Sequence, residues 1–370
     1  MKPRTRPPFR ADHVGSLLRP QRLREARSAW KAGRLPAATL RSIEDECIAA
    51  AIARQREVGL RDATDGEYRR AYWHYDFVSG LDGVEIYEPE QKIQFKGAVL
   101  SHALRVNGRI RYNRPVMVDD YRFVAGHAQG AVPKQTIPSP SVVHFRGGRG
   151  AIDRSTYPDL DDFFADLGEA YHQAVQSFAA AGCRYLQLDE VYIAYLCDPE
   201  QIAGLKARGE HVEGLLDTYA RLVNRAIDGR PDDMTISMHL CRGNFRSTWV
   251  ASGGYEPVAE VLFNRINVDA WFMEYDTDRA GGFEPLRFVP RGEKIVVLGL
   301  ITTKSGALES KDELKRRIDA ASKYLPLEQL ALSPQCGFAS TEDGNLLTEE
   351  DQWAKLRLCV EVAREVWGGV

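Results

Sequence analysis

A histidine and a cysteine two positions apart, His239 and Cys241, end an apolar run in the stretch SMHLCRGNFRSTW. On a β-strand, residues i and i+2 point to the same face about 7 Å apart, so both side chains could reach one metal ion. Such a pair is more often simply part of a protein core. It becomes a metal-site hypothesis only if further ligand residues can be brought to it.

Two such residues follow other predicted strands. Glu274 ends the apolar stretch DAWFME, and Cys336 lies in the turn SPQCG after the stretch QLALS. An acidic loop is the alternative interpretation of Glu274, because Tyr-Asp-Thr-Asp follows it. One imidazole, two thiols and one carboxylate form a donor set that suits tetrahedral zinc better than magnesium or calcium. We therefore expect a zinc site with a net negative charge.

Other polar residues at predicted strand ends could bind a substrate. Glu67 in DGEYRR and Asp189 in LQLDE are carboxylates that could hold an ammonium group, although a turn residue or an ion pair with a nearby arginine explains each equally well. Ser16 follows Gly15 in VGS, where backbone N–H groups could bind a carboxylate. A simple Gly-Ser turn is as common there.

The remaining titratable residues give weaker signals. His13 and His74 could titrate near neutral pH, but a single histidine among aromatic residues is more often structural. Cys47, Cys183 and Cys359 lie on apolar helical patterns and are expected in the core.

The elements that must position these residues follow from the apolar pattern. Eight β-favouring segments recur along the chain, and between most of them apolar residues fall at helical spacing. This alternation favours a closed (β/α)8 barrel over an open doubly wound sheet, whose glycine-rich phosphate loops are missing. The carboxyl ends of barrel strands meet at one mouth, so distant candidates can share a pocket. The expected strands are 12–15, 61–65, 132–137, 184–189, 234–239, 269–274, 295–301 and 329–333, and the expected helices are 38–58, 160–181, 211–227, 311–324 and 349–367.

Two helix starts and one insertion complete the expected organisation. Ser310-x-x-Glu313 predicts a capping box, and Thr348 followed by three acidic residues predicts another helix N-terminus. The aromatic-rich stretch 68–131 is expected to be an insertion between strands two and three, either as hairpins over one end of the barrel or as a subunit contact. Since no repeat or linker divides the chain, residues 1–370 are expected to form a single domain.

The amino-acid composition limits the kinds of molecule that the protein is expected to bind. The chain has 370 residues, of which 49 are basic and 52 acidic, and the formal net charge is −3. Neither nucleic acid nor a membrane surface is indicated, because there is no basic excess and no run near the roughly 20 apolar residues of a membrane span. We expect a cytoplasmic protein with small-molecule substrates, in which the six scattered cysteines are core thiols or metal ligands rather than disulfides.

At these residues the chain resembles a known family, the catalytic C-terminal barrel of cobalamin-independent methionine synthase, in a short single-barrel form. The resemblance runs from about residue 10 to the end, through DHVGSLLRP, TDGEYRR, YLQLDE, MHLCRGNFRSTW, FMEYD and LSPQCGFASTEDGNLLTEEDQWAKL. It implies that His239, Cys241, Glu274 and Cys336 bind a catalytic zinc. It also implies that a substrate thiol is activated as a thiolate at the metal, with Glu274 the ligand that yields.

The resemblance further implies methyl transfer to homocysteine, which forms methionine. The homocysteine pocket would consist of Val14, Gly15 and Ser16, with Glu67 and Asp189 holding the amino group.

The methyl-donor side departs from the family pattern. Pro140 stands near the position of the family's tryptophan, Tyr195 near its glutamate, and Thr302 near its proton-donating histidine. The implied donor, 5-methyltetrahydrofolate, would therefore lack its usual side chains. Two alternatives stay open: a zinc-dependent alkyltransferase using another thiol or an epoxide, like epoxyalkane:coenzyme M transferase, and a barrel with a purely structural zinc. A homo-oligomer is compatible with the sequence.

Overall fold

The computed structural model describes residues 4–89, 93–95, 98–100 and 102–370. Six parallel strands form one sheet in the order β12-β11-β10-β9-β8-β7, and β1 pairs in parallel with β6. Lys134 alone separates β6 from β7, so these two segments belong to one interrupted strand that joins the two sheets. The strands are β1 (Asp62–Ala63), β6 (Val132–Pro133), β7 (Gln135–Pro138), β8 (Tyr185–Glu190), β9 (Thr235–Leu240), β10 (Ala270–Glu274), β11 (Ile295–Ile301) and β12 (Leu330–Pro334).

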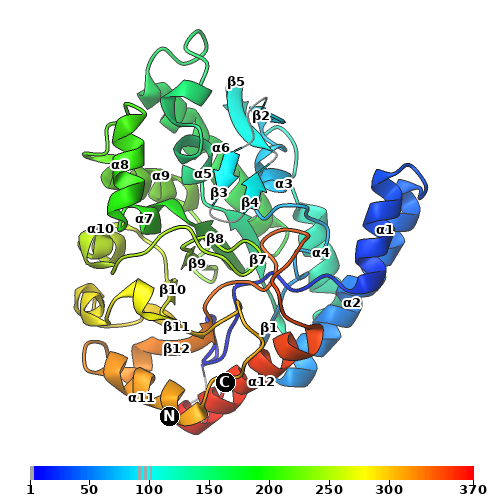
Figure 1. Ribbon diagram of the computed structural model, residues 1–370, viewed down its shortest axis with the longest axis vertical. Coiled ribbons are helices and arrows are strands. Elements are labelled where there is room, and N and C mark those ends of the chain that lie inside the picture. The colour runs from blue at the N-terminus through cyan, green and yellow to red at the C-terminus, as the bar shows by residue number, and fades with distance from the viewer. Residues whose placement is uncertain (1–3, 90–92, 96–97, 101) are drawn as a thin grey trace.

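The first expected strand is reduced to a single bridge. Ala11 pairs in parallel with Leu332 of β12, and the backbone N–H of Asp12 donates to the carbonyl of Leu332 at 3.1 Å. Toward β1, the Thr64 hydroxyl donates to the carbonyl of Gly15 at 2.7 Å. All eight expected segments thus lie in chain order around one centre, and the TIM-barrel-like α/β class is confirmed (Figure 1). Strands β7 to β12 are buried along their whole length, which explains their nearly continuous apolar sequences.

Helices surround these strands (Figure 1). The five expected helices are found as α2, α6, α9, α11 and α12, each within a few residues of the predicted bounds. The longer helices are α1 (Gln21–Lys31), α2 (Ala37–Val58), α4 (Val118–His127), α6 (Leu160–Ala180), α8 (Pro199–Ala207), α9 (Leu215–Ile227), α10 (Glu256–Arg265), α11 (Lys311–Ser322) and α12 (Glu349–Trp367). The short ones are α3 (Tyr75–Val78), α5 (Ser141–Phe145), α7 (Tyr192–Tyr195), η1 (Gly148–Ala151), η2 (Asp278–Ala280), η3 (Glu284–Phe288) and η4 (Leu327–Gln329).

The two predicted helix starts have different outcomes. At α12, the Thr348 hydroxyl accepts from the N–H of Asp351 at 3.1 Å, and the Asp351 carboxylate accepts from the N–H of Thr348 at 2.9 Å. At α11, the prediction of a capping box is wrong, because the Ser310 side chain makes no cap hydrogen bond. Glu313 pairs with Arg316 instead, one turn along the helix surface.

The stretch 68–131 contains two antiparallel strand pairs. β2 (Asp82–Tyr87) pairs with β5 (Ala103–Arg111), and β3 (Ile93–Phe95) pairs with β4 (Ala98–Leu100). The stretch also holds α3 and α4, the second of which packs against α2. Residues 90–92, 96–97 and 101 of this predicted insertion lie outside the described part of the chain.

Several buried polar side chains lie inside the barrel near the start of the strands. We call Asp12, His13, Asp62, Lys134 and Tyr185 the interior cluster. Lys134 Nζ lies 2.9 Å from Asp12 Oδ1, His13 Nε2 lies 3.3 Å from Asp62 Oδ2, and the Tyr185 hydroxyl donates to Asp12 Oδ2 at 3.0 Å. Burial and the nearby Lys134 lower the pKa of His13 to about 3, which agrees with the structural interpretation of this histidine rather than with titration near neutral pH.

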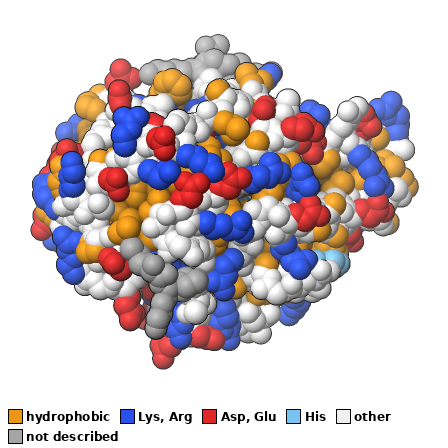
Figure 2. Space-filling model, turned by 90° about the horizontal axis from the view of Figure 1, so that it is seen from below, with side chains coloured by type: hydrophobic (Ala, Val, Ile, Leu, Met, Phe, Trp, Pro, Cys, Tyr) orange, Lys and Arg blue, Asp and Glu red, His pale blue; other side chains and the backbone are white. Residues whose placement is uncertain are grey.

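The outer surface carries both signs of charge. Figure 2 shows basic and acidic side chains interspersed over one face, as the nearly balanced composition predicts. Every helix in the described part of the chain is too short or too polar to cross a bilayer.

Candidate metal centre

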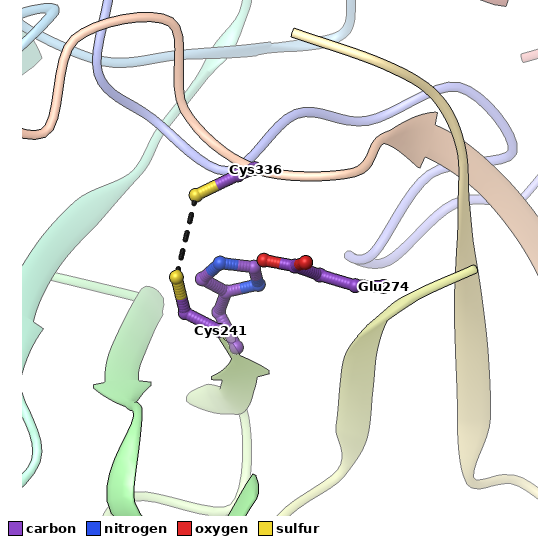
Figure 3. Close-up of side chains that lie close together, drawn as sticks. Cys241, Glu274 and Cys336 are labelled. Atoms are coloured by element: carbon purple, nitrogen blue, oxygen red, sulfur yellow. Dashed lines mark hydrogen bonds between the residues drawn. The ribbon is translucent and has the colours of Figure 1, made fainter. Parts of the chain in front are cut away.

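Three strand ends bring the four predicted ligands together. His239 lies on β9 and Cys241 directly after it, Glu274 is the last residue of the adjacent β10, and Cys336 follows β12. All four side chains are buried, and one ligand atom from each lies within 4.8 Å of the others. Figure 3 shows Cys241, Glu274 and Cys336 directed toward a common point.

The spacing of the two cysteine sulfurs fits a shared metal ion. Cys241 Sγ and Cys336 Sγ are 3.6 Å apart, much farther than the roughly 2 Å of a disulfide bond. Two sulfurs bound at about 2.3 Å to one tetrahedral zinc would be separated by about 3.8 Å. The thiol pair is therefore arranged for a metal of this size.

The histidine provides a second indication. Both ring nitrogens of His239 are buried and make no hydrogen bond of ordinary geometry among the described residues, and the ring interacts instead with the thiol of Cys336, another candidate ligand. A buried imidazole without ordinary hydrogen bonds is costly in a folded protein, and a metal bond would satisfy one of its nitrogens. This ring next to two thiols and a carboxylate matches the donor set of a zinc site.

Electrostatics prepare the ligands to bind a cation. The hydrogen bond from the Cys241 thiol lowers the pKa of Cys336 well below its usual range, while it raises that of Cys241. Burial would raise the pKa of Glu274, but the positive charges of Lys304 and Arg279 outweigh it and hold that pKa low. The Cys336 thiol and the Glu274 carboxyl group are thus both shifted toward their negatively charged forms, which bind cations.

Four of the five predicted substrate residues line the same cavity as three of the four predicted metal ligands. Val14, Ser16, Glu67 and Asp189 share this cavity with His239, Cys241 and Cys336. Gly15 does not face the cavity but shapes the segment. It has a φ of +135°, and a Cβ there would lie 2.7 Å from the side chain of Thr136.

Glu67 and Asp189 form a pair of buried carboxylates. Glu67 adopts the left-handed conformation with φ of 59°, which is uncommon outside glycine, and its carboxylate accepts from the Thr136 hydroxyl at 2.9 Å. Arg70 lies 3.3 Å from the same oxygen. Burial and the charge of Glu67 raise the pKa of Asp189 to about 7. An ammonium ion between the two carboxylates would remove their repulsion.

Further residues that line the cavity come from segments that the sequence did not single out as a group. Tyr72, Trp73 and His74 line it from the start of the predicted insertion, together with Arg146 and Tyr195. Burial and the neighbouring Arg146 lower the pKa of His74 well below 6.5, which agrees with the structural interpretation of this histidine rather than with titration near neutral pH. Tyr195, which the sequence marks as a departure from the family, thus lies on the wall of this cavity.

The two other departures lie elsewhere. Neither Pro140 nor Thr302 is among the described residues that line this cavity. The cations near Glu274, which are Arg279 and Lys304, were also missed. They follow the strand ends by several residues in loops, where neither periodicity nor spacing marks a neighbour of the metal ligands.

Comparisons with known proteins identify the family of the chain. Residues 9–365 match the sequence family described as the cobalamin-independent synthase, catalytic domain. The chain belongs to this family. It is 49% identical over 366 residues to the uncharacterized protein YxjG of Bacillus subtilis, covering 98% of this chain and 96% of that protein. The family prediction is confirmed.

Two further relatives extend the comparison. A Listeria monocytogenes crystal structure, described as a candidate vitamin-B12-independent methionine synthase, superposes with a TM-score of 0.81 at 41% identity. That alignment covers 99% of this chain and 100% of the other. A protein of Saccharolobus solfataricus named methionine synthase is 24% identical over 355 residues, covering 95% of this chain and 93% of that protein. Family membership supports an enzymatic methyltransferase.

Proposed function

We propose that this protein is a zinc-dependent methyltransferase that moves a methyl group to the thiol of homocysteine and so forms methionine. The observation that carries the proposal is the position of two buried carboxylates, Glu67 and Asp189, in the same cavity as three predicted metal ligands. A matching ligand has an ammonium group at one end and a sulfur at the other. Homocysteine has this chemistry, and the S. solfataricus relative is named for its product.

The amino-acid end of the substrate is proposed to be held by charged side chains. Its ammonium would lie between Glu67 and Asp189, where it stabilises both ionised carboxylates. Its carboxylate is proposed to bind the Val14 to Ser16 segment on the same cavity. These contacts fix the side chain toward His239 and Cys241.

The sulfur end is proposed to react at the metal centre. Zinc held by His239, Cys241, Glu274 and Cys336 would keep the substrate thiol deprotonated at neutral pH, where a free thiol with a pKa near 8.5 is mostly protonated. Glu274 is the ligand proposed to be exchanged for the thiolate. The sulfur then attacks the methyl carbon: a sulfur–carbon bond forms, the bond between the methyl group and its donor breaks, and the donor keeps the electron pair.

The methyl donor is proposed to bind in the same cavity, beside its aromatic lining residues. The family resemblance implies 5-methyltetrahydrofolate, and the aromatic rings of Tyr72, Trp73 and Tyr195 offer stacking surfaces for a planar donor. These rings also cover the cavity, which limits the access of water to the reacting sulfur.

The test is to titrate zinc-loaded protein with homocysteine by calorimetry in two buffers of different ionisation enthalpy. We expect binding with release of about one proton, since the thiol binds as a thiolate. Cysteine, which is one methylene shorter, and coenzyme M, which has no ammonium group, serve as matched ligands and should bind at least about 30-fold more weakly. Methionine formation is then assayed with 5-methyltetrahydrofolate.

The same titration separates the alternatives. Tighter binding of coenzyme M than of homocysteine would favour an alkyltransferase that uses another thiol. Absence of proton release with every thiol would favour a structural zinc and contradict the proposal.

A further inference from the structure

The two carboxylate oxygens of Glu274 each have a protein partner. The backbone N–H of Arg242 donates to Oε1 at 3.1 Å, and Arg279 Nη2 donates to Oε2 at 2.9 Å. The residue is completely buried. His239 differs from it, because neither of its ring nitrogens makes a hydrogen bond of ordinary geometry among the described residues. Among the nitrogen and oxygen ligands, Glu274 is therefore the one already satisfied away from a metal.

Arg279 is held in place by contacts that do not involve Glu274. Its Nη2 also donates to Asp276 Oδ1 at 2.7 Å, and its guanidinium carbon lies 5.1 Å from the ring centre of Trp249. The backbone carbonyl of Arg279 accepts from the N–H of Gly253 at 2.8 Å. These contacts fix the guanidinium group, so that it is a preformed partner for the carboxylate.

Charge around the site favours the same arrangement. Lys304 has a buried Nζ without a hydrogen-bond partner in the described part of the chain, and its charge acts on both Glu274 and Cys241. Exchange of a carboxylate for a substrate thiolate adds one negative charge to the pocket, because the released carboxylate stays. Two cations beside Glu274 can balance that added charge.

We propose that Arg279 is a positioning residue that receives the Glu274 carboxylate when a substrate thiol replaces it at the metal. Arg279 and the metal then compete for one carboxylate, and this competition makes Glu274 the ligand that yields. The inference rests on the proposed function for the thiol step. Its metal step can be measured without any thiol.

The competition predicts opposite effects on two affinities. In Arg279→Met, Glu274 loses its hydrogen-bonded cation and is left to the metal, so zinc should bind on the order of tenfold more tightly, opposite to the 10–100-fold loss that is typical when a residue that only orients a ligand is removed. Homocysteine should bind on the order of tenfold more weakly to the zinc-loaded variant, because the displaced carboxylate would keep only the charge of Lys304 nearby and no cation that hydrogen-bonds to it. A residue that only supports the fold would weaken both.

The experiment measures the zinc dissociation constant of the full chain by competition with a chelator, and then the homocysteine dissociation constant by calorimetry. Arg287→Met is the matched control, since Arg287 pairs with Glu256 at the surface and should change neither value. Arg279→Lys keeps the charge but loses the forked geometry. It should change both affinities in the same directions by a smaller factor, and it decides the question if Arg279→Met does not fold.

Tighter zinc with weaker homocysteine supports the inference. Weaker or unchanged zinc binding in both Arg279 variants overturns it, because Arg279 would then orient Glu274 or have no role. Failure of the wild-type protein to bind homocysteine contradicts the proposed function instead, and the zinc measurements still decide whether Arg279 competes for Glu274.

Discussion

Two fully buried carboxylates in the same barrel, Asp12 and Glu274, have different surroundings. Asp12 accepts hydrogen bonds from the N–H groups of Phe9 and His13, from Lys134 and from the Tyr185 hydroxyl. Glu274 accepts two hydrogen bonds next to the ring of His239. Asp12 is thus satisfied by a cation and three other donors, whereas Glu274, although paired with Arg279, lies beside an imidazole whose nitrogens make no ordinary hydrogen bond among the described residues. Unsatisfied groups beside a cavity, rather than burial alone, identify the functional cluster.

The largest expected effect is on stability, in the interior cluster. Lys134→Met removes the cation beside Asp12 and should lower the free energy of unfolding by about 3–5 kcal/mol, because a buried charge is left unpaired. Urea denaturation of the metal-free protein measures this change. A decrease in the free energy of unfolding below about 1 kcal/mol would contradict the view that Asp12 depends on Lys134 as its counterion.

The metal centre is expected to show the converse effect, with a large loss of zinc affinity and a small change in stability. Cys336→Ser should weaken zinc binding by more than about 100-fold, since even the loss of a residue outside the ligand set costs 10–100-fold. Without metal, its free energy of unfolding should change by less than about 2 kcal/mol, because no cation loses its partner. Chelator competition and urea denaturation give the two values. Unchanged zinc binding by Cys336→Ser would show that Cys336 is not a metal ligand.

A smaller effect is expected at the carboxylate pair. Glu67→Gln and Asp189→Asn should each raise the dissociation constant of homocysteine by about 30-fold, equivalent to about 2 kcal/mol for one partner of a buried ion pair. Coenzyme M, which has no ammonium group, is the control ligand and should not bind more weakly. Equal losses for both thiols would mean that these residues support the pocket rather than bind the ammonium group.

The smallest effect concerns pH. The pKa of His13 is about 3 in the folded protein and near 6.5 when unfolded, so below pH 6.5 the unfolded chain binds the extra proton. Stability is therefore lost as pH falls from 6.5 toward 3, by up to about 1.4 kcal/mol per pH unit. His13→Gln should lack this slope when unfolding is measured from pH 7 to 5. Parallel profiles for the two proteins would show that His13 is not held neutral.

The sequence predicted the strands and the clustering of the four candidate ligands because both have local signals. Each strand is a short apolar run, and His239, Cys241, Glu274 and Cys336 all lie at or just after the end of one. Parallel strands then bring those ends to one mouth. The failed capping box at Ser310 shows the limit of this approach, because the competing pair of Glu313 with Arg316 depends on side-chain geometry.

The further lining residues of the cavity and the cations beside Glu274 could not be predicted in this way. Tyr72, Trp73 and Arg146 reach the cavity from loops whose course is set by tertiary packing. Arg279 comes five residues after Glu274, in a chain that contains many arginines. Its neighbours Asp276 and Trp249 are known only once the fold is formed.

The central claim is that the metal centre binds and activates a substrate thiol. Zinc-edge X-ray absorption on the zinc-loaded protein, with and without homocysteine, tests it most directly, with coenzyme M in a parallel sample. We predict a shell of two sulfurs that gains a third with homocysteine and loses one oxygen neighbour as Glu274 leaves. An unchanged shell in both samples, or protein that binds no zinc, would contradict the account.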